Sequence, residues 1–151
     1  MYLVGHAAIG MTLAAGTDDP VLAFVIGWAS HYVADFFPHG DEEAGDWVKR
    51  GHEIKRLLVL VGIDGILLAS AYGWFVLHRG FSPAPLAAAV GATVPDVMWG
   101  IEKVFKRKLF GAHERLHGLN HNFFDVRMPL WLGLALQAAV TGFLWYRLTL
   151  G

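Results

Sequence analysis

Long apolar stretches separated by polar ones dominate this sequence. Five of them cover residues 2–15, 21–37, 57–77, 83–105 and 129–148, and the two largest polar stretches cover residues 38–56 and 106–125. Turn and capping residues mark the boundaries: Asp18 or Asp19 can cap the second stretch with Pro20 in its first turn, and Pro38 ends it. The pattern predicts an all-α chain of about five helices, folded as a single domain over residues 1–151.

Several of these helices have the length needed to cross a membrane. A hydrocarbon core of about 30 Å requires around 20 residues of helix. The third, fourth and fifth stretches meet that length, the second is marginal, and the first is too short unless it is tilted or sheltered by its neighbours. The chain is also 55% hydrophobic, with a mean hydropathy of +0.44, against about 45–50% apolar residues in soluble domains. We expect an integral membrane helical bundle; the alternative is a very apolar soluble bundle.

The basic residues are distributed unevenly between the two sides that five crossings define. Ten of them share one side with the N-terminus and both long polar stretches, and only Arg79 and Arg147 lie on the other. Positively charged loops stay inside, so the N-terminus and the polar stretches are expected to be cytoplasmic. The ten are Lys49, Arg50, Lys55, Arg56, Lys103, Lys106, Arg107, Lys108, Arg115 and Arg127.

Two features of the overall composition restrict the chemistry. There are no cysteines, which excludes disulfides, thiolate metal sites and cysteine nucleophiles. The formal net charge is −1, so nothing draws the whole chain toward nucleic acid, and no nucleic-acid partner is expected.

The stretch from Trp28 to Asp41 holds the most informative polar pair, His31 and Asp35. They are four residues apart at the end of an apolar helix, so both side chains lie on one helix face. Imidazole and carboxylate are ligands for zinc, manganese or non-haem iron, and such a pair in an apolar segment is costly unless something binds it. The alternative is a helix end at which a buried histidine donates to the nearby carboxylate.

Further residues of the same type fall at the same end of the predicted bundle. His6, His39, Asp64 and Asp96 all lie toward the cytoplasmic side, and of eight histidines only His78 lies on the opposite one. Helix propensity does not require this arrangement. We therefore expect a divalent metal site, zinc first and manganese or iron as alternatives, near the inner membrane surface.

The second polar stretch contains a run of histidines, His113, His117 and His121, spaced so that one helix face would align them. Residues 113–117 also match H-E-x-x-H, in which two histidines hold zinc and the glutamate is the base. A metalloprotease and a solvated loop helix with incidental histidines are both open alternatives. We favour His117 and His121 as ligands and Glu114 as the general base or a substrate-side acid.

Four short motifs together resemble the small membrane-bound metal-dependent hydrolases, the YdjM-like hydrolases of prokaryotic inner membranes. They are His-x-x-Ile-Gly at residues 6–10, His-x-x-x-Asp at 31–35 followed by Pro-His-Gly at 38–40, Gly-Ala-x-x-Pro-Asp at 91–96 and His-x-x-x-His at 117–121. His-x-x-x-Asp is also similar to the ligand helix of the all-helical zinc-dependent phospholipase C and nuclease group. The resemblance implies a prokaryotic cytoplasmic membrane protein that hydrolyses a phosphoester.

The leading hypothesis is therefore a membrane-embedded metal-dependent hydrolase of a lipid or lipid-linked phosphoester at the cytoplasmic face, with nearby basic residues available for an anionic headgroup. A di-metal oxidase or hydroxylase of the His-box kind and a non-enzymatic metal-binding membrane protein are the alternatives. Glu114 and Asp64 are the candidate catalytic residues. The candidate ligands are His6, His31, Asp35, His39, Asp96, His117 and His121.

Overall fold

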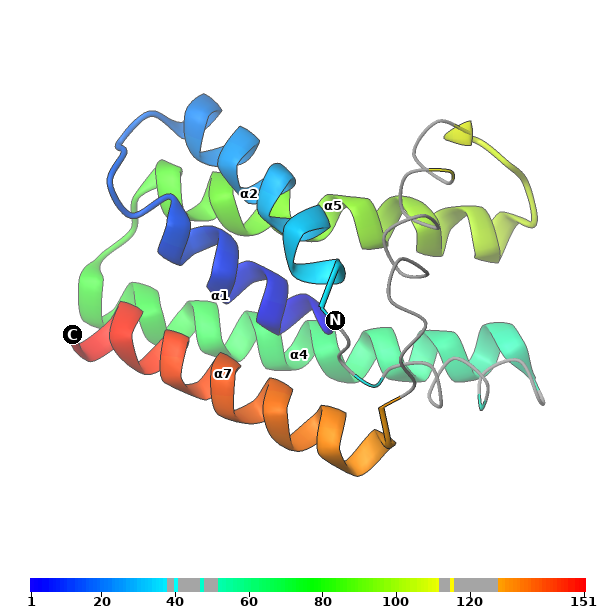
Figure 1. Ribbon diagram of the computed structural model, residues 1–151. Coiled ribbons are helices and arrows are strands. Elements are labelled where there is room, and N and C mark those ends of the chain that lie inside the picture. The colour runs from blue at the N-terminus through cyan, green and yellow to red at the C-terminus, as the bar shows by residue number, and fades with distance from the viewer. Residues whose placement is uncertain (38–39, 41–46, 48–51, 112–114, 116–127) are drawn as a thin grey trace.

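Helices make up the regular structure of the described chain, which contains no strand and confirms the predicted all-α class. The computed structural model describes residues 1–37, 40, 47, 52–111, 115 and 128–151. Within them lie α1 (Leu3–Leu13), α2 (Pro20–Asp35), α4 (Glu53–Arg79), α5 (Pro83–Phe105) and α7 (Leu130–Leu150). The short helix α1 is central and contacts each of the other four, with α2 and α5 to one side of it and α4 and α7 to the other (Figure 1).

The helix ends follow from local chemistry. Asp19 is the residue that caps α2: its side chain accepts a hydrogen bond from the backbone N–H of Val21 at 2.8 Å, and Pro20 occupies the first turn. α4 ends at Gly80, whose φ of +79° suits glycine, and α5 ends at Lys106, which has a φ of +52°. α2 ends two residues before the end of its apolar stretch, so its last helical residue is Asp35.

The core of the described chain is rich in alanine, with a few larger side chains such as Met11, Phe75 and Trp145, and many large apolar residues are exposed. The fully buried hydrophobic residues are alanines, whereas Leu77, Val21 and Trp131 are 81%, 72% and 70% exposed. A water-soluble bundle buries its large apolar side chains because their transfer out of water drives folding. Cores rich in small residues let helix backbones approach closely, which is common for helices packed in lipid. The fully buried alanines are Ala7, Ala8, Ala23, Ala88 and Ala92.

Two of the described helices, α4 and α5, are long and apolar enough to cross a membrane. A core helix of a soluble protein can have the same length and composition, so burial distinguishes the two cases. Only 6% of the apolar window of α4 is buried, against 33% for α5; α4 is therefore not a core helix. α7 has the predicted length, 21 residues, but is not one of these two, and α2 and α1 have 16 and 11 residues.

Two glycines allow α2 and α5 to pack backbone against backbone. A Cβ atom added to Gly27 would lie 2.1 Å from the carbonyl oxygen of Ala88, and one added to Gly91 would lie 2.2 Å from that of Phe24. No larger residue fits at either contact without a shift of the helices. This contact brings the last turns of α2 beside the middle of α5.

Candidate metal site

Three helices contribute ionisable side chains to one buried cluster. His6 comes from the first turn of α1, His31 and Asp35 from the last turns of α2, and Asp96 from α5, directly after Pro95. The predicted shared face of the α2 pair is present, because His31 Nε2 lies 3.1 Å from Asp35 Oδ2. The cluster therefore unites residues up to 90 positions apart in the sequence.

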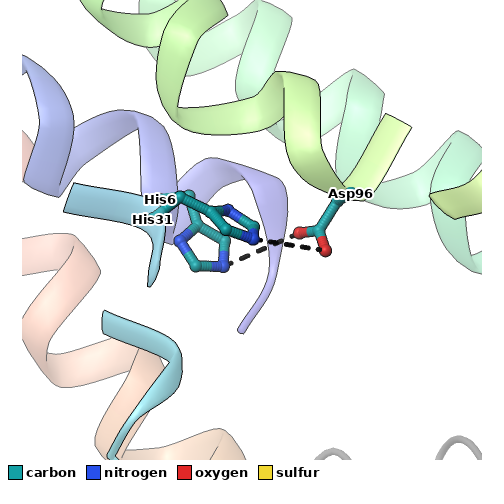
Figure 2. Close-up of side chains that lie close together, drawn as sticks. All are labelled: His6, His31 and Asp96. Atoms are coloured by element: carbon teal, nitrogen blue, oxygen red, sulfur yellow. Dashed lines mark ion pairs between the residues drawn. The ribbon is translucent and has the colours of Figure 1, made fainter. Parts of the chain in front are cut away.

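The two imidazoles point the same nitrogen at the same carboxylates. His6 Nε2 lies 3.2 Å from Asp35 Oδ1 and 3.6 Å from Asp96 Oδ2, and His31 Nε2 lies 3.9 Å from Asp96 Oδ1. Figure 2 shows both rings directed toward the carboxylate of Asp96. One ligand atom each from His6, His31 and Asp96 falls within 4.8 Å of the others.

These separations suit ligands that share one small divalent cation. Ligand nitrogen and oxygen atoms lie about 2.0–2.2 Å from zinc, so two ligands of a tetrahedral site are about 3.4 Å apart. The four nitrogen–oxygen distances in the cluster run from 3.1 to 3.9 Å. His6, His31 and Asp96 could thus hold a metal ion, with Asp35 beside both imidazoles as a fourth ligand or as their hydrogen-bond acceptor.

A backbone carbonyl sets the orientation of the His31 ring. His31 Nδ1 lies 2.9 Å from the carbonyl oxygen of Ala92 in α5. A carbonyl can only accept, so in the neutral ring Nδ1 carries the proton and Nε2 keeps the lone pair that a metal needs. Metal-binding histidines usually have such a partner on their second nitrogen. Sequence reasoning missed this contact because a backbone carbonyl leaves no residue signature.

The imidazole of His6 is buried at the centre of the cluster. Its side chain is fully buried and stacks on His31, with ring centroids 4.1 Å apart and planes at 28°. Its Nδ1 has no hydrogen-bond partner among the described residues, and its Nε2 faces the carboxylates of Asp35 and Asp96. The position of Nε2 between two carboxylates is the one from which it could bind a cation that they share.

Burial of the two carboxylates differs. The side chain of Asp35 is 0% exposed and also lies 3.3 Å from the amino group of Met1, whereas that of Asp96 is 22% exposed. The Asp96 edge is therefore where a small molecule could reach the cluster. A single buried histidine donating to a nearby aspartate, the simpler alternative for the α2 pair, does not account for a second imidazole and a second carboxylate at the same point.

Asp64 stands next to this cluster with a structural contact of its own. Its side chain accepts hydrogen bonds from the backbone N–H groups of Leu3 and Val4, the latter at 3.2 Å, and so caps α1 from α4. Gln137 of α7 accepts from the backbone N–H of Tyr2 at 3.1 Å and holds the same helix end. The sequence signal that could have indicated this contact is a lone glutamine in an apolar stretch. The catalytic role predicted for Asp64 stays a prediction.

The remaining predicted residues lie outside the described part of the chain. This applies to the loop ligand that follows α2 and to the late histidine run with its glutamate. Their roles stay predictions: they are His39, His113, Glu114, His117 and His121.

Comparison of the chain with protein-family models, with curated proteins and with solved structures finds no match. Any assignment of function therefore rests on the residues and the geometry described above.

Proposed function

We propose that this protein is a membrane-embedded, metal-dependent hydrolase acting on a lipid or lipid-linked phosphoester at the cytoplasmic face. The observation that carries the proposal is the convergence of His6, His31 and Asp96 within 4.8 Å inside an apolar helical bundle. The membrane bilayer and a phosphoester lipid are the partners that the proposal implies, and zinc is the favoured metal.

The exposed apolar surface of the helices supports membrane embedding. α4 is long, apolar and almost unburied along its apolar window, and large apolar side chains lie outside a core of alanine. Water would disfavour this surface by roughly 25 cal/mol per Å² of exposed apolar area. Lipid removes that cost. The excess of basic residues on one side supports a cytoplasmic position for the metal cluster.

Hydrolysis is supported by the donor set and by the one-sided position of the cluster. A divalent cation held here would supply Lewis-acid activation of water and of the scissile group. Asp35 and the Ala92 carbonyl orient the imidazoles, and the Asp96 side chain is 22% exposed. The motif resemblance to membrane-bound metal-dependent hydrolases points the same way.

A transport pathway across the membrane has less support. Between the cluster and the opposite end of the bundle, the helical segments 7–13, 20–30, 65–77, 83–95 and 130–146 carry no Asp, Glu, Lys, Arg or His. Transporters place such residues along the whole path of the ion. The cluster is therefore better suited to chemistry on one side.

Elemental analysis combined with a phosphoester panel tests this function. We expect purified wild-type protein to carry zinc or manganese and to cleave at least one phosphoester. His31→Ala and Asp96→Ala should lose metal and turnover, whereas the matched controls His78→Ala and Asp18→Ala, both exposed and far from the cluster, should keep both. Metal-free wild-type protein would contradict the proposal, and iron with oxygen-dependent turnover would favour an oxidase.

A further inference from the structure

The central helix α1 is shorter than α4 and α5, which extend beyond its start. α1 begins at the level of the metal cluster, where Asp64 caps it. α4 starts 11 residues before Asp64, and α5 ends nine residues after Asp96. At 1.5 Å per residue, these helices extend about 16 Å and about 14 Å past the cluster.

An open surface cavity of about 770 Å³ lies at this end, against the first two turns of α4 and the residue that ends α5. Ile54, Leu58 and Val59 line its apolar part. Leu58 precedes Asp64 by six residues, which is about 9 Å along the helix axis. The cavity is thus separate from the metal cluster but close to it along the axis of α4.

The charged lining of the cavity favours an anion. Lys55 from α4 and Lys106 from the end of α5 both line it, and Glu53 is the one acidic residue among the lining residues of the described chain. Lysine is a common phosphate ligand because it acts as a mobile point charge. A site with two lysines and an adjoining wall of aliphatic side chains suits a phosphate that is attached to a hydrocarbon chain.

We propose that this cavity binds the headgroup phosphate of an anionic membrane lipid, with Lys55 and Lys106 on the phosphate and Ile54, Leu58 and Val59 along the start of the acyl chain. The inference rests on the membrane embedding in the proposed function. It adds that the substrate class is an anionic phospholipid, recruited beside the cluster through its headgroup phosphate. The aliphatic wall is the reason for choosing a lipid over a free phosphate ion.

The test is a titration of the detergent-purified full chain with dioctanoyl phosphatidylglycerol, compared with dioctanoyl phosphatidylcholine and inorganic phosphate. Each lysine near the headgroup is expected to contribute about fivefold in affinity. Lys55→Gln and Lys106→Asn should therefore each weaken phosphatidylglycerol binding by about that factor; asparagine is used at position 106 because it tolerates the left-handed backbone. Lys103→Gln is the matched control, since Lys103 Nζ lies over the Trp99 ring at 5.3 Å and does not line the cavity.

Three results would overturn the lipid site. Equal weakening in Lys103→Gln would mean diffuse surface charge. Equal affinity for phosphatidylcholine would reject a site selective for anionic lipids, and equally tight inorganic phosphate would mean a site for free anions. Asp96→Ala separates this proposal from the proposed function: it should lose metal but keep phosphatidylglycerol binding. Lipid binding without metal or hydrolysis in the wild type would retain the site and reject the enzyme, and the reverse would reject the site alone.

Discussion

The α2–α5 pair and the α4–α7 pair are packed in opposite ways. α2 and α5 meet backbone to backbone through Gly27 and Gly91, and their contact is the most extensive between described helices. On α4, by contrast, Gly65 and Gly73 have nothing within 4 Å of an added Cβ. α4 and α7 meet through large side chains such as Phe75 and Trp145, while others, such as Leu77 and Trp131, are exposed. The first pair carries His31, Asp35 and Asp96. Most of the metal cluster therefore lies on the two helices whose contact leaves no space for a larger side chain at Gly27 or Gly91.

The largest effect should come from filling the tight contact. Gly27→Ala puts a Cβ 2.1 Å from the Ala88 carbonyl oxygen, and overpacking against backbone should cost more than about 3 kcal/mol in unfolding free energy. Because the helices must separate, metal affinity should fall as well. Gly73→Ala, in open space on α4, should instead stabilise by up to about 1 kcal/mol through helix propensity. Thermal unfolding in detergent and metal content measure both, and similar behaviour of the two variants would remove the contrast.

An intermediate effect is expected on the outer face of α4. Ile66 is 68% exposed, so Ile66→Lys in a soluble bundle should change stability by no more than about 0.5 kcal/mol. In a membrane span the same lysine should cost about 2.5–3.5 kcal/mol of insertion. The fraction of chain that resists alkaline extraction from membranes measures this.

Leu109→Lys, at a 51% exposed position beyond the end of α5, is the control and should insert normally. Full insertion of Ile66→Lys would mean that this face of α4 does not contact lipid.

The smallest effect should distinguish the two roles of Asp64. As the cap of α1 it accepts from Leu3 and Val4, and Asp64→Ala should cost about 1.5–3 kcal/mol, the range for hydrogen bonds to charged groups. Metal affinity should drop about tenfold, as for other supporting residues, because His6 lies in the capped turn. Chemical denaturation and metal titration measure these changes.

Asp64→Asn keeps one acceptor oxygen and should lose less of both. If Asp64 is catalytic, as the sequence predicted, this variant would retain its fold and its metal but have no turnover.

Short-range patterns predicted much of this molecule correctly. The apolar stretches located each described helix to within a few residues, and the spacing of His31 and Asp35 placed them on one face, because both depend only on the period of the α-helix. Asp19 as a cap followed from the same local chemistry. Depth along the predicted bundle also pointed to His6 and Asp96 as members of the cluster.

Other features required the tertiary arrangement. No local pattern indicates that the Ala92 carbonyl orients His31, that Asp64 caps a helix 60 residues away, or that Lys55 and Lys106 line one cavity. These contacts depend on which helices approach closely and in what register, and that is decided by steric fit at points such as Gly27 and Gly91. Helical periodicity orients a side chain around its own helix, whereas only the packing of one helix on another determines what that side chain meets.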